Sequence, residues 1–234
     1  MITAIWVSLL SGNSGSWSGL AYADAPSPAW QSANSAGMQA YRQGRYADAK
    51  QWFLQALTEA ERSGEPNPSQ AMTLNNLAAV HEALGESEEA ELRYQQSLFV
   101  IETIQGPNHP DLVPGLQNLA LLYAQGGKIQ QAEPLLRRSL HILEAHLGTT
   151  HAHLLPTLMS LAQVTQWQGR LGEAEELYSR ALKIADSELE SGHQQTTTIL
   201  HRYAALLRKM NRDKEAALLE ERATVPQGAR GEKN

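Results

Sequence analysis

Residues 116–144 read LQNLALLYAQGGKIQQAEPLLRRSLHILE. On either side of Gly126-Gly127 the apolar residues recur at spacings of three and four, which is typical of amphipathic helices. The same pattern returns at intervals of 42 residues in both directions along the chain. A helix pair of this size cannot bury its apolar stripes alone, so the repetition predicts helix pairs that stack on their neighbours.

Three sets of small or turn-forming residues keep the 42-residue interval: Ala78, Ala120, Ala162 and Ala204; Ala90, Ala132, Ala174 and Ala216; and Gly85, Gly127, Gly169 and Asn211. The first repeat follows the same pattern with an interval of 41. We therefore expect an all-α solenoid domain over residues 29–224, built from about five helix-turn-helix repeats. The expected helices span residues 29–42, 46–62, 69–84, 87–104, 111–125, 129–146, 153–168, 171–187, 195–210 and 213–224.

Within each expected helix, the spacing separates a core side from an outer side. Leu116, Leu119, Ala120 and Tyr123 form one apolar stripe, and a small residue in the stripe lets the partner helix approach closely. Pro134 is tolerated only in the first turn of a helix, so its helix is expected to begin near residue 129 or to kink.

Composition excludes several functional classes. The chain has 234 residues, a formal net charge of −6 and no cysteine. The negative charge and the dispersed Lys and Arg argue against nucleic-acid binding, which needs clustered positive charge. The lack of cysteine excludes disulfides, thiolate metal sites and cysteine nucleophiles.

The first 25 residues differ from the rest of the chain. Residues 2–10 form an apolar run too short to cross a bilayer, and residues 23–25 (Ala-Asp-Ala) have the form of a signal-peptidase site. No Lys or Arg precedes the run. We expect a signal peptide and a periplasmic or secreted protein that is not an integral membrane protein once processed. The alternative is a disordered extension on a cytoplasmic protein. Residues 225–234 are expected to be a disordered tail.

Two short motifs carry a family resemblance. Residues 106–111 (GPNHPD) precede LQNLA at residues 116–120, and residues 74–78 read LNNLA. This arrangement resembles the tetratricopeptide repeat, in a long 42-residue form similar to that of kinesin light chains, over about residues 30–224. The resemblance implies a right-handed α-solenoid whose first helices line a concave face that holds an extended peptide or a partner protein.

The residues that face away from the core stripe of each first helix are the candidate partner-binding residues. Amides suit a peptide backbone because each offers donors and an acceptor. The alternative is that these amides bond a neighbouring helix or meet water. Basic residues near the C-terminal end would favour acidic ligands, or form an ordinary solvated face. The candidates are Asn34, Tyr41, Arg42, Asn75, Asn76, Gln117, Asn118, Gln125, Gln163, Gln166, Trp167, Arg202, Arg208 and Lys209.

Three histidines also keep the 42-residue interval: His109, His151 and His193. Equivalent places on stacked helices are about 8–10 Å apart or more, whereas zinc ligands lie ~2.1 Å from one ion. We therefore interpret these histidines as structural, in capping or packing. His146 and His153 lie close to His151 in sequence, so a metal carrier or enzyme that uses these three is a further hypothesis.

No motif of a zinc protease, a phosphate-binding loop or a nucleophile elbow occurs in the sequence. We predict a non-enzymatic scaffold or adaptor without cofactor or metal, which binds a protein or an extended peptide and no nucleic acid. A cytosolic assembly or sensor module is the alternative. The sequence does not determine the oligomeric state.

Overall fold

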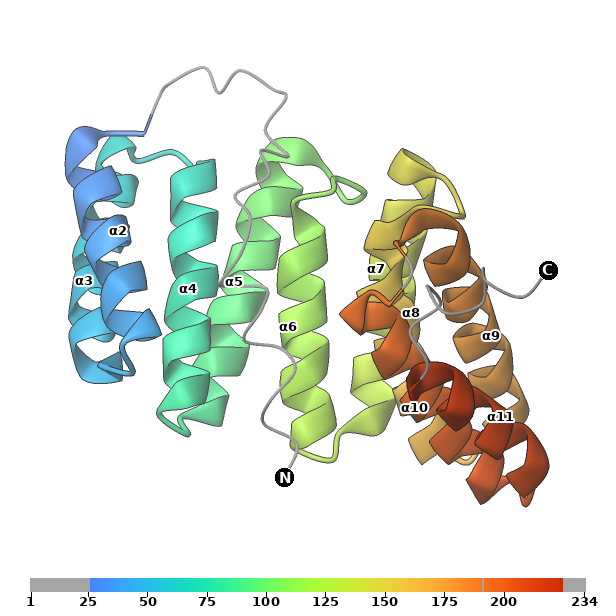
Figure 1. Ribbon diagram of the computed structural model, residues 1–234. Helices are drawn as coiled ribbons and strands as arrows, with labels where there is room; N and C mark the ends of the chain where they lie inside the picture. Colours follow the sequence, from blue (N-terminus) through green and yellow to red (C-terminus); the bar gives the residue numbers. More distant parts are fainter. Residues whose placement is uncertain (1–25, 191, 225–234) are drawn as a thin grey trace. The chain divides into compact units, whose positions relative to one another are not determined.

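The computed structural model describes residues 26–190 and 192–224 (Figure 1). These residues form ten α-helices and two short 3-10 helices, and the part described contains no strand. The signal-peptide and tail predictions, at residues 1–25 and 225–234, lie outside the described residues. None of the helices that the structure describes is both long and apolar enough to cross a membrane. The chain divides into two compact units, Met1–Gly115 and Leu116–Asn234, which we describe separately.

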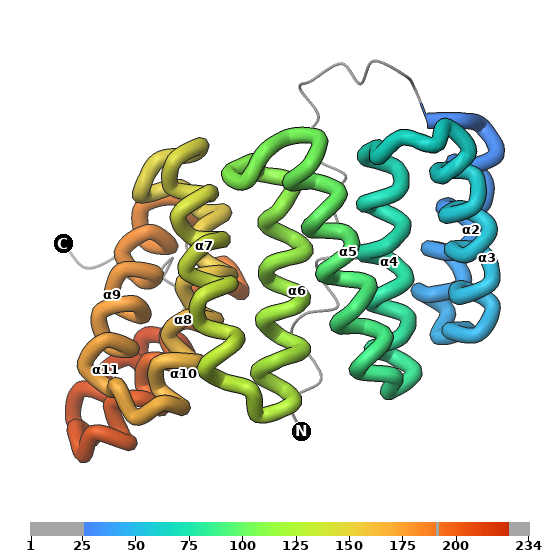
Figure 2. Tube along the Cα trace, turned by 180° about the vertical axis from the view of Figure 1, so that it is seen from behind, coloured from blue at the N-terminus to red at the C-terminus, as the bar shows by residue number. Residues whose placement is uncertain are grey.

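Unit 1 contains two complete helix pairs. Helix α2 packs on α3 and α4 packs on α5, while α3 also contacts α4 (Figures 1 and 2). A single 3-10 turn, Glu61–Ser63, follows α3. The α-helices are α2 (Pro28–Arg42), α3 (Tyr46–Ala60), α4 (Pro68–Ala83), α5 (Ser87–Gln105) and the beginning of α6 (Leu112–Gln125).

Unit 2 contains the rest of α6 and five further helices. Helix α8 packs against both α7 and α9, and α10 packs against both α9 and α11. A 3-10 turn, Ala152–Leu154, precedes α8. The remaining helices are α7 (Ile129–Leu147), α8 (Leu155–Trp167), α9 (Leu171–Glu188), α10 (Gln194–Lys209) and α11 (Asp213–Thr224).

The ten predicted helices are all present, with local differences at their ends. The helix expected at 46–62 ends at Ala60, and the one expected at 153–168 begins at Leu155. Pro156 explains the later start, because proline fits the first turn of a helix and lacks the N–H that an interior position needs. Helix α7 begins at Ile129 as predicted, but Pro134 is its sixth residue and thus lies beyond the first turn.

The predicted core stripes are buried in both units. The small residues Ala78, Ala162 and Ala204 have no exposed surface, and Ala120 is 1% exposed. On the second helices, Tyr94 and Tyr178 are each 1% exposed. Burying a large apolar side chain contributes roughly 1.5–3 kcal/mol, so the repeated Ala and aromatic positions hold each pair together.

The turn inside each repeat requires a left-handed backbone. Gly85, Gly127 and Gly169 have φ of 78°, 75° and 80°. Asn211 occupies the equivalent place in the last repeat with φ of 61°. Asparagine tolerates this region better than most residues with a side chain, which explains why the last repeat can depart from glycine here.

Candidate peptide-binding surface

In four repeats a side chain at the same relative position caps the start of the first helix or of the short turn that leads into it. Asn67 Oδ1 accepts a hydrogen bond from the backbone N–H of Gln70 at 3.0 Å. In the three following repeats the same place holds a histidine, whose Nδ1 accepts from the N–H two residues later, at 3.1–3.2 Å. The capping interpretation of His109, His151 and His193 is thus confirmed. These caps help to set where each first helix starts, and so where its outer face lies.

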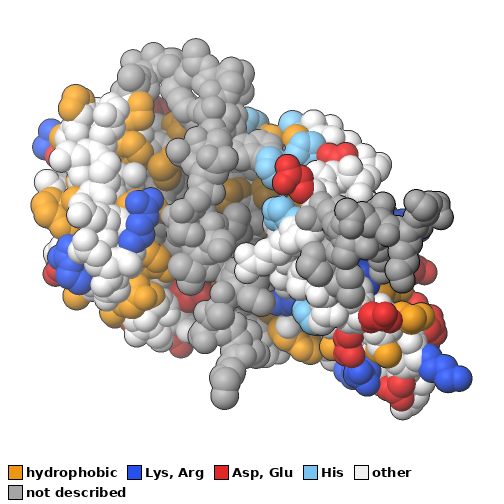
Figure 3. Space-filling model, in the orientation of Figure 1, with side chains coloured by type: hydrophobic (Ala, Val, Ile, Leu, Met, Phe, Trp, Pro, Cys, Tyr) orange, Lys and Arg blue, Asp and Glu red, His pale blue; other side chains and the backbone are white. Residues whose placement is uncertain are grey.

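Acidic residues are segregated from the first helices. The first helices of the repeats, α2, α4, α6, α8 and α10, contain one acidic residue, Glu82. Each of the helices that follow them, α3, α5, α7, α9 and α11, contains at least two. In Figure 3 the part of unit 1 over α2 and α4 shows mainly hydrophobic and uncharged side chains, while α11 of unit 2 shows red and blue intermixed. The chain's negative charge therefore lies mainly on the second helices, and the first-helix faces are neutral to basic.

In unit 1 two of the candidate amides bond each other and so join neighbouring repeats. Asn76 is 7% exposed, and its Nδ2 donates to Asn34 Oδ1 at 3.0 Å, so α4 is bonded to α2. Tyr41 is half-buried with its ring 5.3 Å from that of Tyr46, and Arg42 is exposed. Asn75 is half-buried. The structure thus brings Asn34 and Asn76 together. For these two residues it agrees with the second interpretation, in which the amides bond a neighbouring helix.

In unit 2 a candidate amide of α6 likewise bonds a neighbouring first helix, α8. Gln117 is 8% exposed and donates from Nε2 to Thr157 Oγ1 at 2.6 Å. Asn118 is half-buried and Gln125 is exposed. Trp167, the last residue of α8, keeps 43% of its surface exposed. Of these residues, Gln125 and Trp167 are the most accessible to a partner.

The basic candidates on α10 already have protein partners. Arg202 donates to Gln163 Oε1 at 2.7 Å, and it opposes the rise that burial causes in the pKa of Tyr178. Lys209 lies 3.5 Å from the carbonyl oxygen of Gln166. Arg208 donates twice to Glu220, at 3.0 and 2.6 Å. Glu220 stands at the position that Tyr178 holds in the preceding repeat, so the last repeat has an ion pair in place of a buried ring. A binding role for the 14 candidate residues stays a prediction.

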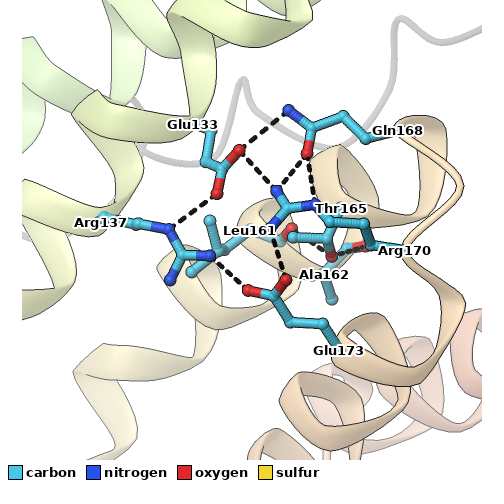
Figure 4. A network of polar contacts seen from close by, with 8 residues as sticks. All are labelled: Glu133, Arg137, Leu161, Ala162, Thr165, Gln168, Arg170 and Glu173. Carbon is cyan, nitrogen blue, oxygen red and sulfur yellow. Dashed lines mark hydrogen bonds and ion pairs between the residues drawn. The ribbon is translucent and has the colours of Figure 1, made fainter.

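The second-helix side of unit 2 carries a network of charges (Figure 4). Glu133 of α7 accepts from Arg137 at 2.8 Å, from Gln168 at 2.9 Å and from Arg170 at 2.5 Å. Arg137 and Arg170 both also pair with Glu173 of α9. Burial alone would raise the pKa of Glu133, but the hydrogen bonds from Arg170, Gln168 and Arg137 outweigh it and lower this pKa to about 2. Each carboxylate therefore ties one repeat to the next.

Equivalent ion pairs recur between other repeats. Arg212 pairs with Glu175 at 2.6 Å in unit 2, and Lys50 pairs with Glu86 at 2.9 Å in unit 1 with the two charges exchanged. These pairs are not among the residues predicted from the sequence. Opposite charges that stand 36 or 37 residues apart at equivalent repeat positions were the signal that could have revealed them.

The histidines of the metal hypothesis are placed by local contacts. His146 Nδ1 lies 3.0 Å from the carbonyl oxygen of Ile142, and the rings of His151 and His153 are 4.7 Å apart. Burial, and then the nearby His151, lower the pKa of His153. Within the ranges 26–190 and 192–224, no three His, Cys, Asp or Glu side chains are grouped to hold one metal ion.

Two models of known protein families match the chain, and both describe the same repeat. Models described as tetratricopeptide repeat match residues 31–99 and 154–224, and residues 116–153. No curated protein matches the chain in sequence.

Solved structures share the fold at low sequence identity. The nearly identical TPR-like repeats of a kinesin light chain-like protein from Podosopora anserina align with a TM-score of 0.74 and 22% identity, over 87% of this chain and 97% of that one. BtubC (BKLC) from P. vanneervenii aligns with a TM-score of 0.78 and 16% identity, over 87% and 82%. MamA from Desulfovibrio magneticus RS-1 aligns with a TM-score of 0.62 and 12% identity, over 88% and 99%. The chain belongs to the tetratricopeptide repeat family, whose repeats form a general protein–protein interaction module.

Proposed function

We propose that this protein is a non-enzymatic adaptor that binds an extended, neutral-to-acidic segment of a partner protein on the outer faces of its first helices. The observation that carries the proposal is the segregation of charge, with one acidic residue among five first helices. A neutral-to-basic face within a chain of net charge −6 attracts an acidic segment that the second helices would repel.

The contacts within the face limit which residues reach a partner. Asn76 and Gln117 are nearly buried and already bonded, so their replacement would disturb repeat packing before any binding was tested. Arg42, Gln125 and Trp167 are exposed on three different first helices. These three side chains offer a cation, an amide and an aromatic surface, which suit carboxylates, peptide groups and apolar side chains respectively.

Site-specific photo-crosslinking in the native host tests the proposal. A photoreactive amino acid would replace Arg42, Gln125 or Trp167 in the full chain, and adducts would be identified by mass spectrometry. Matched positions at His141 and Lys183, which are exposed on second helices, serve as controls. We expect one partner to be captured from the first-helix positions only. Capture from the control positions alone would contradict the assignment of the face.

We also propose that the adaptor is exported, on the basis of the apolar run at residues 2–10 and the Ala-Asp-Ala sequence at 23–25. N-terminal sequencing of the protein from cell fractions tests this. A mature chain that starts near residue 26 in the periplasmic or secreted fraction is expected. An intact N-terminus found in the cytosol would favour the alternative, a cytosolic assembly or sensor module.

A further inference from the structure

Helices α3 and α5 present an uncharged, partly apolar surface on the side of unit 1 opposite the first helices. In Figure 1 α2 and α4 lie in front of α3 and α5, and Figure 2, seen from behind, shows α3 and α5 on the near side. We call this the α3–α5 outer surface and define it by Gln51, Trp52, Leu54, Gln55 and Thr58 of α3 with Leu92 and Phe99 of α5.

Four large apolar side chains of this surface are open to solvent. Phe99 is 68% exposed, Leu92 44%, Trp52 41% and Leu54 39%. Leu92 and Phe99 are seven residues apart on α5, so they lie on one stripe two turns apart. Four large, exposed apolar side chains on the second helices of one unit mark a candidate contact surface.

The surface also lacks the charges that cover its counterparts in unit 2. Residues 51–58 contain no charged residue, and residues 92–99 contain only Arg93, which donates to Gln96 at 3.0 Å. The equivalent segment of α7, residues 134–141, holds two arginines, and that of α9, residues 176–183, holds a glutamate, an arginine and a lysine. The two segments of unit 1 thus carry one charged residue between them, against five in the two segments of unit 2.

We propose that the α3–α5 outer surface binds the same surface of a second copy of this chain. In a two-fold contact the patch of one copy meets the same patch of the other copy, so a charged residue near the axis faces a residue of the same charge. Amides and apolar groups do not have this restriction, because an amide is both donor and acceptor. Two copies of net charge −6 repel each other over most of their surface. The uncharged patch is where that repulsion is weakest and where apolar burial is available.

In the proposed contact, an exposed side chain of each copy meets a depression on the other. Five side chains of α3 line a shallow depression of about 420 Å³, namely Gln51, Trp52, Leu54, Gln55 and Thr58. Phe99, the most exposed apolar residue of the surface, would enter the depression of the second copy, and the second copy's Phe99 would enter this one. The contact spans the outer faces of only two helices in each copy, so we expect a weak, reversible dimer.

Sedimentation of the full-length chain over a range of concentrations tests the proposal. The wild type should show a concentration-dependent monomer–dimer equilibrium, and Phe99→Glu should remain monomeric. Leu218→Glu is the matched control, because Leu218 of α11 is 66% exposed and lies outside the surface. It should dimerise like the wild type. Thermal unfolding of both variants should match the wild type, since neither residue is in the core.

A charge-pair variant separates a specific two-fold contact from general stickiness. In the proposed contact Phe99 of one copy lies against Gln55 of the other, so Phe99→Glu combined with Gln55→Lys should restore dimerisation. A wild type that stays monomeric at every concentration overturns the proposal, and so does dimerisation that survives Phe99→Glu. Failure of the double variant to recover would overturn the proposed geometry. The first-helix crosslinking experiment is independent of each of these outcomes.

Discussion

Unit 1 and unit 2 contain the same repeat but differ in the surface of their second helices. Ion pairs join neighbouring repeats in both units, but in unit 2 the outer segments 134–141 and 176–183 also carry five charged residues. In unit 1 the corresponding helices expose Trp52, Leu54 and Phe99. The core positions that define the repeat are alike in both units, so the units differ in their outer positions and not in their core.

The difference also concerns how each unit responds to its surroundings. The Glu133 network depends on ionised carboxylates and on guanidinium groups, so it is sensitive to pH and to salt. The exposed apolar side chains of unit 1 do not titrate, and salt does not screen them as it screens an ion pair. The two units should therefore be distinguishable by experiments that perturb either the shared core or the different surfaces.

The largest expected effect tests the shared core. Ala78→Glu in unit 1 and Ala162→Glu in unit 2 each place a carboxylate where no surface is exposed. An unpaired buried charge should cost more than about 4 kcal/mol and abolish cooperative unfolding of the unit that contains it. Hydrogen exchange followed by mass spectrometry would locate the loss. Protection that stays unchanged in both variants would contradict the common core.

Acid should weaken unit 2 through Glu133. Its folded pKa of about 2 lies below the unfolded value of about 4.3, so the stabilisation is present above pH ~4.3 and is lost as the pH falls towards 2. Each pKa unit corresponds to about 1.4 kcal/mol, which sets an upper limit of about 3 kcal/mol for this group. Urea unfolding at pH 6 and pH 3 would measure the loss.

Glu133→Gln provides the control for the acid experiment. The variant should be less stable than the wild type at pH 6. The difference should shrink at pH 3, because the Glu133 carboxyl then binds a proton in the unfolded chain but scarcely in the folded one, which lowers the stability of the wild type. An equal difference at both pH values would show that packing, rather than charge, accounts for the contribution of Glu133.

A close packing contact in unit 1 gives a smaller effect. A Cβ atom added at Gly37 would lie 2.7 Å from the Phe53 ring, whereas one added at Gly172 of unit 2 would meet nothing within 4 Å. Gly37→Ala should therefore destabilise by roughly 1–3 kcal/mol. Gly172→Ala should be neutral or stabilising by up to about 1 kcal/mol. Chemical denaturation of both variants makes the comparison, and equal effects would show that the Gly37 contact relaxes without cost.

The smallest effect concerns the helix caps. His151→Ala removes the acceptor of the His153 N–H and should cost about 1 kcal/mol. His151→Asn should be close to neutral, because Asn67 performs the same task in unit 1. Thermal unfolding compares the two variants. If His151→Asn were as damaging as His151→Ala, the histidine would have a role beyond capping.

Much of the fold was predictable because its determinants are local. The Ala and Gly positions at 42-residue intervals gave nearly all helix boundaries, with misses where Pro156 delays α8 and where α3 ends in a 3-10 turn. The candidate surface was only partly predictable. A spacing of 100° per residue separates core from solvent, but Asn76 and Gln117 lie at the edge between the two.

The sequence by itself determined the repeat, its helices and the buried stripe of each helix, because these follow from periodicity within about 20 residues. Only the tertiary structure decided which amides face a partner and which face a neighbouring helix. The outcome depends on how closely α4 approaches α2 and how closely α8 approaches α6. At the observed distances Asn76 bonds Asn34, and Gln117 bonds Thr157. Distances between helices are set by packing over the whole unit, which no local pattern records.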